Sequence, residues 1–254
     1  MDNDNVEHKY YKPFFSLIII NIHWILHILC IIIDPEVDVN SISPNESWPI
    51  TLRIFSSCPN CIDLRYQIWR LYTYSLLHKD LEHLFFNLIC LFSLGSVLEI
   101  FIGHFKVSLF YFSSIILSAF SISIFSPYTV VVGVSGAVYG FLGGLTSFFF
   151  IQINESYFYI GLILIIIIIS IDILLFYLQN NSNTSYNIHL FGFINSFILG
   201  FIIINPIKKL KYHKVLKFIC FPILVGFYIF LIHSYIFLDY AKDSKYKNEC
   251  CFLK

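Results

Sequence analysis

Hydrophobic residues fill long blocks of this chain, and polar residues are confined to short stretches between them. About seven blocks approach the roughly 20 residues that a membrane-spanning helix needs. They cover residues 14–33, 83–102, 107–125, 135–151, 157–178, 188–204 and 218–238, and the longest polar stretches are 1–12 and 34–77. Because a segment in a bilayer must satisfy its own backbone hydrogen bonds, the pattern predicts an all-α polytopic membrane protein.

Composition agrees with a protein whose solvent is a lipid bilayer. Hydrophobic residues make up 57% of the chain and charged residues 13%, which is too apolar for a soluble domain. The formal net charge is zero, so no nucleic-acid partner is expected. The seven cysteines are scattered, which suits small buried side chains better than a disulfide framework. For Cys58 and Cys61, either a loop disulfide or free thiols remain possible.

Lysines in the short links predict the orientation. They crowd the link between the last two blocks, whereas the stretch 34–77 is acidic and the link QNNSNTS has no lysine. Since cytoplasmic links are enriched in Lys and Arg, the amino terminus is expected inside and the carboxyl terminus outside, although lysines in the tail oppose this. The lysines in question are Lys106, Lys208, Lys209, Lys211, Lys214 and Lys217.

With alternating spans, the second, fourth and sixth blocks begin at the same outer depth. Polar residues gather there, namely His83, Asn87, Ser135 and His189. Polar groups inside spans are costly and usually mark function or an internal partner, so these residues are expected to form one site. Small residues continue below them in two rows that would let the fourth and sixth spans approach closely. The rows are Gly136, Gly140 and Gly144, and Gly192, Ser196 and Gly200.

The residue types suggest nucleophilic catalysis. A serine hydroxyl needs a base to take its proton, and His189 is the candidate base for Ser135. His83, the Asn87 amide and the Ser135 backbone N–H could stabilise an oxyanion. Tyr139 could stack on His189 in place of a third acidic member, so a dyad is expected, with no cofactor and no metal.

These motifs, in this order, resemble the rhomboid family of intramembrane serine proteases. Besides the dyad, the resemblance covers Trp69-Arg70, Thr73, His78, Gly95 with Glu99, Gly133-Val134-Ser135-Gly136, and His189 with Gly192. At two positions where the family commonly has alanine and glycine, this chain has the bulkier Ile188 and Ser196.

The resemblance implies a six-helix catalytic core with one additional C-terminal helix. The expected division is a cytoplasmic head at 1–13, the core at 14–205, and a basic link, seventh helix and tail at 206–254. It also implies hydrolysis of single-pass membrane proteins near the outer or lumenal face, in the secretory pathway or plasma membrane. The bias toward Ile, Phe, Asn and Lys is typical of a very AT-rich genome such as a malaria parasite's, where surface adhesins would be substrates.

Alternatives remain at several positions. Taken alone, Ser135 would more often be a small packing residue, and the whole chain could be an inactive rhomboid-like protein that binds client helices. A transporter is disfavoured because no paired repeats or broken helices are seen. His78 is expected to order the outer loop, and Trp69 and Arg70 to serve as an interfacial anchor with a scaffold role. Glu99 is expected to accept hydrogen bonds at a helix end or from a loop. Asp172 could face the cavity or a neighbouring helix.

Overall fold

The computed structural model describes residues 10–33, 67–125, 131–152, 159, 161–163, 165–170, 186–206 and 212–237. Its regular elements are helices, and five of them are long and apolar enough to cross a membrane. These are α1 (Phe14–Ile33), α4 (Leu81–Ile102), α5 (His104–Phe125), α8 (Tyr186–Ile203) and α9 (His213–Phe237). A shorter apolar helix, α6, spans Ser135–Ile151. The chain is a polytopic all-α membrane protein.

The apolar blocks predicted the helix positions well. The bounds of α1 and α6 agree with the prediction, while α4, α5 and α9 begin two to five residues earlier. At α4 the reason is a cap, because the Asp80 side chain accepts a hydrogen bond from the His83 backbone N–H at 2.6 Å. The described residues within 157–178 are helical. Two short helices, α3 (Arg70–Thr73) and η1 (Tyr74–Leu76), lie in a stretch predicted to be loop.

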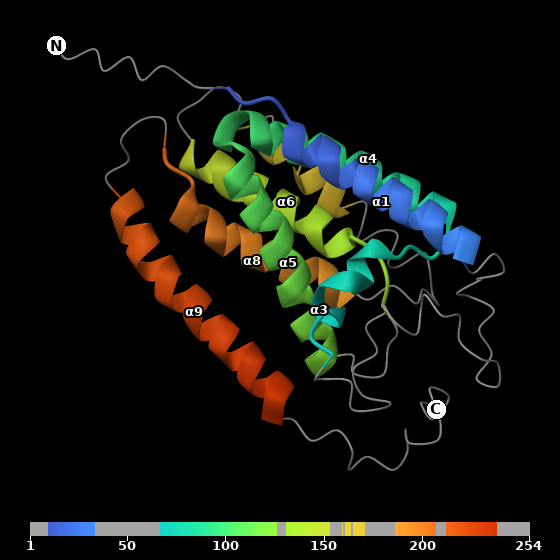
Figure 1. The fold of residues 1–254 in the computed structure, drawn as a ribbon. Coiled ribbons are helices and arrows are strands. Elements are labelled where there is room, and N and C mark those ends of the chain that lie inside the picture. Colours follow the sequence, from blue (N-terminus) through green and yellow to red (C-terminus); the bar gives the residue numbers. More distant parts are fainter. Residues whose placement is uncertain are drawn as a thin grey trace.

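Helix α6 lies at the centre of the bundle, among α4, α5 and α8 (Figure 1). Its closest neighbour is α8, and small residues make this approach possible. A Cβ added to Gly192 would overlap the Gly136 carbonyl oxygen, and one added to Gly140 would lie 3.2 Å from Ser196 Oγ. A Cβ on Gly200 would overlap Ser147. Gly136 and Gly140 of the first row thus lie against Gly192 and Ser196 of the second, whereas Gly144 lies against Phe110 of α5.

Helix α1 lies beside α4 (Figure 1) and is held there by Glu99. The Glu99 side chain is fully buried and accepts hydrogen bonds from the backbone N–H groups of Phe15 and Ser16, at 2.7 and 2.9 Å. It also accepts one from Ser16 Oγ at 2.7 Å, and His104 Nδ1 lies 2.5 Å from its other oxygen. Glu99 thus caps the first turn of α1, as the sequence led us to expect of a helix-end acceptor.

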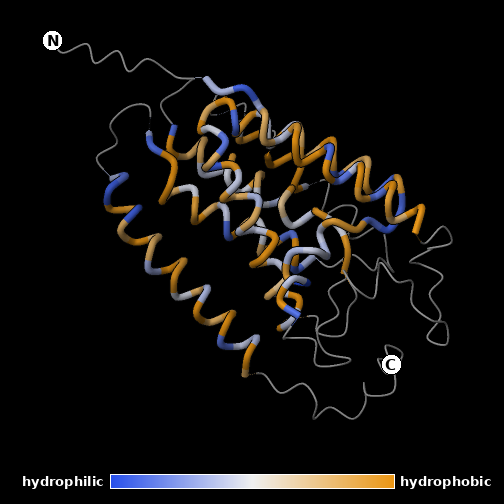
Figure 2. The backbone as a smooth tube through the Cα atoms, in the orientation of Figure 1, coloured by the Kyte–Doolittle hydropathy of each residue, from blue (hydrophilic) through white to orange (hydrophobic). Residues whose placement is uncertain are grey.

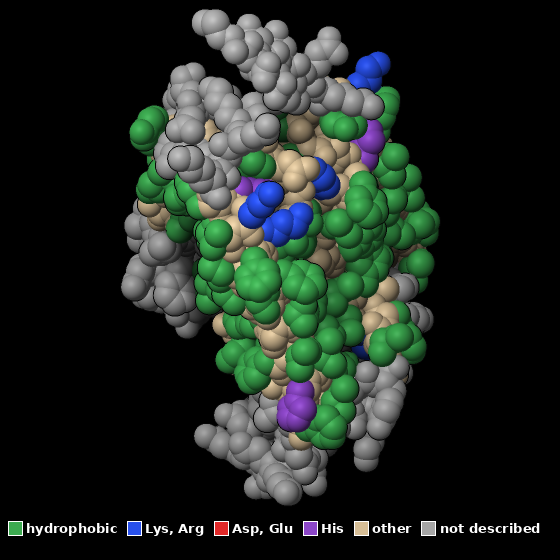
Figure 3. Space-filling model, turned by 90° about the vertical axis from the view of Figure 1, so that its left-hand side faces the viewer, with side chains coloured by type: hydrophobic (Ala, Val, Ile, Leu, Met, Phe, Trp, Pro, Cys, Tyr) green, Lys and Arg blue, Asp and Glu red, His purple; other side chains and the backbone are tan. Residues whose placement is uncertain are grey.

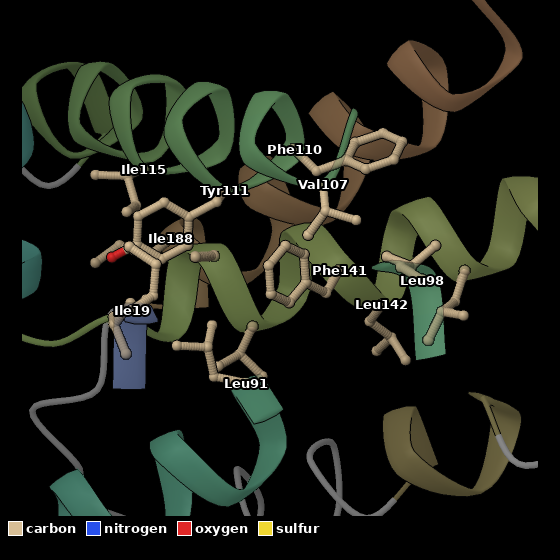
Figure 4. Close-up of a cluster of buried hydrophobic side chains, with 14 of the residues drawn as sticks. Ile19, Leu91, Leu98, Val107, Phe110, Tyr111, Ile115, Phe141, Leu142 and Ile188 are labelled. Atoms are coloured by element: carbon tan, nitrogen blue, oxygen red, sulfur yellow. The ribbon is translucent and has the colours of Figure 1, made fainter. Parts of the chain in front are cut away.

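The core is built from aliphatic and aromatic side chains of α1, α4, α5, α6 and α8. Figure 4 shows Phe141 of α6 between the α5 side chains Phe110 and Tyr111 and the α4 side chain Leu91. Hydrophobic residues also recur along the outer faces of the long helices (Figure 2). Exposed apolar side chains of this kind are expected where lipid is the solvent.

Helix α9 packs along one side of the bundle, against α5 and α8. Phe227 stacks on Phe191 of α8 at 5.6 Å between ring centroids, and Tyr235 contacts Phe120 of α5 edge-on at 5.1 Å. The rest of its surface is mostly exposed and apolar, as at Phe230, which is 55% exposed. The face seen in Figure 3 is accordingly covered by hydrophobic side chains, with Lys and Arg gathered toward one end.

Candidate active site

Helix α6 begins at Ser135, just after a tight turn. Gly133 has a φ of +115°, a conformation that side-chain-bearing residues rarely adopt, and its N–H donates to the Tyr74 carbonyl at 3.1 Å. A Cβ there would also lie 2.8 Å from Cε1 of His83. Both the backbone conformation and the contact with His83 therefore favour glycine at position 133. The turn leaves Ser135 partly exposed at the first position of the helix, two residues after the glycine that lies against the His83 ring.

His189 meets this helix start from α8. Its ring stacks on that of Tyr139, with centroids 4.1 Å apart and planes inclined by 8°. Tyr139 is four residues after Ser135 and therefore on the same face of α6. One turn along, Gly192 touches the backbone of Gly136. Ser135 and His189 thus lie on the N-terminal side of this contact in their two helices, and the Tyr139 ring covers that of His189.

Hydroxyl groups of α5 hold the backbone of α8 on both sides of His189. Ser118 Oγ donates to the Ile188 carbonyl at 2.9 Å, and Ser114 Oγ donates to the Gly192 carbonyl at 3.3 Å. Ile188 is 3% exposed, and its Cγ2 lies 3.1 Å from the position a Cβ would take on Gly136. The bulky Ile188 is thus packed into the contact beside the small residue Gly136.

The two side chains named for oxyanion stabilisation lie in different settings. His83 lies against the Gly133 turn. Asn87 is buried one turn further along α4, where its Nδ2 donates to the His83 carbonyl at 2.8 Å. His83 therefore faces the start of α6 directly, whereas the bond made by the Asn87 amide supports the turn that carries His83.

Two histidines of α1 extend this group, and sequence reasoning missed them. The rings of His23 and His27 lie 5.5 and 6.3 Å from that of His78, which lies 5.5 Å from His83. His23 also hydrogen bonds to the Tyr111 hydroxyl at 2.8 Å. The i, i+4 spacing of the α1 pair was the available signal, because it places both on one face.

His78 is the centre of this cluster. It is 7% exposed, and neither ring nitrogen has a hydrogen-bond partner. Burial lowers its pKa well below the usual 6.5, and the neighbouring histidines add to the effect, while a backbone contact at Leu76 opposes it in part. His78 is therefore neutral at physiological pH, which suits the loop-ordering role expected for it.

The loop before α4 is tied to the bundle through Tyr74, a residue that the motifs did not single out. Its side chain is fully buried, and its hydroxyl donates to the Ile115 carbonyl of α5 at 2.9 Å. Since its own carbonyl accepts from Gly133, Tyr74 connects α5 to the turn before Ser135. Nearby, Arg70 Nε donates to Gln67 at 2.7 Å, and Trp69 is 49% exposed.

Asp172, Cys58, Cys61 and the charged tail lie outside the described residues. Among the residues that the structure does describe, no group of His, Cys, Asp and Glu could hold a metal ion.

Comparison with known proteins bears directly on this site. Residues 65–206, more than half of the chain and the part that carries every residue of the candidate dyad, match the rhomboid domain. The chain belongs to the rhomboid family. The described part of this rhomboid is the membrane-embedded bundle that holds Ser135 and His189.

Similar rhomboids come from distant organisms. Mouse Rhomboid-related protein 2 is 27% identical over 210 residues, which cover 78% of this chain and 69% of the mouse protein. Two Bacillus subtilis relatives are named as proteases, the second of them putatively. Rhomboid protease GluP is 31% identical over 53% of this chain and 24% of its own length, and YdcA is 33% identical over 57% and 71%. The match thus spans most of two relatives but only a quarter of GluP.

Proposed function

We propose that this rhomboid is a serine endopeptidase that hydrolyses peptide bonds in or next to the spanning helix of membrane-anchored proteins. The observation that carries the proposal is the parallel stack of Tyr139 on His189, one helical turn from Ser135. A stack holds an imidazole in one orientation, which a general base needs and a spacer in a packing row does not. The relatives named as proteases support the same reaction class.

Each residue then has a chemical task. His189 takes the proton of the Ser135 hydroxyl as its oxygen attacks the substrate carbonyl carbon, and later gives that proton to the leaving amine. The Ser135 N–H, unsatisfied within the first turn of α6, and the His83 ring stabilise the oxyanion. Water then attacks the acyl-enzyme, with His189 again as base, and frees Ser135. Asn87 supports His83 through the bond to its carbonyl.

The surroundings favour a substrate that arrives through the bilayer. The helices around the site expose apolar side chains, such as Phe85 and Phe86 beside His83, which are 50% and 58% exposed. A soluble peptide would have no reason to collect against such a surface, whereas a spanning helix shares its solvent. Single-pass membrane proteins, surface adhesins among them, are the proposed substrate class. The proposed location is a membrane of the secretory pathway or the plasma membrane, with the site toward the lumen or exterior.

The test uses a co-expressed single-pass reporter and a pair of matched variants. Ser135→Ala and His189→Ala should each abolish cleavage, because a positioned imidazole contributes on the order of 10²- to 10⁴-fold. Ser123→Ala is the serine control, since the Ser123 hydroxyl bonds only within its own helix turn, to Ala119 at 3.1 Å. His233→Ala on the exposed side of α9 is the histidine control. Both controls should cleave normally.

Cleavage that persists in Ser135→Ala would refute the proposal. Reporter binding by the wild type with no cleavage, unchanged in Ser135→Ala, would instead identify a client-binding protein. A fluorophosphonate probe gives an independent readout, since it should label the wild type at Ser135 and fail to label either site variant.

A further inference from the structure

A second polar cluster lies in the middle of the bundle, where α5, α8 and α9 meet. Asn195 of α8 is fully buried, and its Nδ2 donates to Ser113 Oγ at 2.8 Å and to Ser114 Oγ at 3.2 Å. Its Oδ1 accepts from the Tyr228 hydroxyl of α9 at 2.9 Å. Ser114 Oγ is also bonded to Ser196 Oγ at 2.7 Å. The cluster therefore joins three helices through one buried amide.

Burying the Asn195 amide is destabilising unless all of its polar atoms, the donors and the acceptor, are hydrogen bonded. Here the Asn195 donors face α5 and its acceptor faces α9, so the amide is satisfied only when both neighbouring helices are in place. Leucine would pack in the same space without that requirement. The residue thus specifies one arrangement of the three helices.

Hydrogen bonds connect Asn195 to the part of α8 next to His189, the candidate base. Ser114, which receives the Asn195 amide, donates in turn to the Gly192 carbonyl at 3.3 Å. Gly192 is three residues from His189 and touches the backbone of α6. Through Ser114, Asn195 is thus linked to the Gly192 carbonyl, about one turn from His189 on α8.

Helix α9 supplies the last donor. Tyr228 sits next to Phe227, whose ring stacks on Phe191 of α8 with planes inclined by 15°. Because this contact fixes the α9 backbone against α8, the Tyr228 hydroxyl has a defined position opposite Asn195. The main contacts of α9 are with α5 and α8.

We propose that Tyr228 and Asn195 are positioning residues for the dyad, and that α9 influences catalysis through the Tyr228 hydroxyl. This inference rests on the proposed proteolytic function. Neither residue touches the reacting atoms. Their hydrogen bond holds α8 in the register at which His189 can take the Ser135 proton.

The test variant is Tyr228→Phe, which keeps the ring and removes the hydroxyl, and with it the bond to Asn195 and the longer contact with the Ser113 carbonyl at 3.5 Å. A base misplaced by a fraction of an ångström loses rate, so kcat should fall on the order of tenfold. KM should stay unchanged, because the Tyr228 hydroxyl bonds to groups of α5 and α8 and not to His83 or the turn before Ser135. The labelling rate of Ser135 by a fluorophosphonate should fall in parallel with kcat.

The double variant Tyr228→Phe with Asn195→Leu separates positioning from stability. Replacing both partners by apolar groups removes the orphaned acceptor, so the thermal stability of the purified full chain should return toward that of the wild type. The kcat should remain low, because the bond that sets the register is still missing. Phe230→Leu, on the lipid-facing side of α9, is the control and should match the wild type in both measurements.

The outcomes are distinct. Equal kcat in Tyr228→Phe and Phe230→Leu, with an active wild type, overturns the inference and leaves the proposed function standing. Recovery of kcat together with stability in the double variant also overturns it, since the bond would then be only structural. A wild type that neither labels nor cleaves refutes the proposed function, and the inference with it.

Discussion

Glu99→Gln is the sharpest test of how the bundle is held together away from the dyad. The carboxylate accepts two donors on each oxygen: Phe15 N–H and His104 on one, Ser16 N–H and Ser16 Oγ on the other. A glutamine keeps one such oxygen. The amino group of the glutamine replaces the second oxygen and there faces the Ser16 hydroxyl and the Ser16 backbone N–H. The hydroxyl can rotate and accept a hydrogen bond from this amino group, but the backbone N–H can only donate and is left without an acceptor.

The cost follows from this count. One orphaned buried N–H costs about 1 to 3 kcal/mol, and the surviving bonds weaken because the acceptor is no longer charged. The amino end of α1 also loses a negative charge, which contributes about 0.3 to 1 kcal/mol or more where it is partly buried. Together these predict a loss of about 3 kcal/mol in the free energy of unfolding, a large share of what a membrane bundle of this size is expected to have.

Equilibrium unfolding of the detergent-solubilised chain, followed by far-ultraviolet circular dichroism, measures this loss. Glu82→Gln is the matched control, because Glu82 is an exposed carboxylate in the first turn of α4. It should unfold like the wild type. If Glu99→Gln unfolds within about 0.5 kcal/mol of that control, the range of a neutral surface change, the account of Glu99 as the cap of α1 is wrong.

Two further predictions concern packing and pH. Gly192→Ala should cut cleavage by at least tenfold and destabilise the bundle, because its Cβ would overlap the α6 backbone. Gly226→Ala is the control and should do neither, since a Cβ there would meet nothing within 4 Å. Reporter cleavage and thermal unfolding measure the two effects. The lowered pKa of His78 predicts that the free energy of unfolding is constant above about pH 6.5 and falls as the pH drops below it, since the unfolded chain then binds a proton that the folded chain excludes. The slope, up to about 1.4 kcal/mol per pH unit, should flatten in His78→Phe. An unaltered slope would assign the effect to other groups.

Local patterns explain why so much of the fold was predictable. The bounds of α1 and α6 follow from apolar runs ended by polar residues, which is a property of adjacent residues alone. The meeting of Gly136 with Gly192 was also within reach, because small residues at i, i+4 on two spans have few other uses. Helix α4 begins two residues before its apolar block, because the Asp80 side chain caps it, and a hydropathy pattern contains no signal for a cap.

By itself, then, the sequence determined the number of apolar runs, the order of the motifs and the identity of the residues that could form a dyad. Only the tertiary structure decided which other side chains join them. His23 lies 55 residues from His78, and Tyr228 lies 33 residues from Asn195, and nothing in either local sequence names its partner. The physical reason is that a lipid-facing and a core-facing side of an apolar helix look alike in sequence. Packing against neighbouring helices chooses between them, and that choice turned one tyrosine of the last helix toward the helix that carries His189.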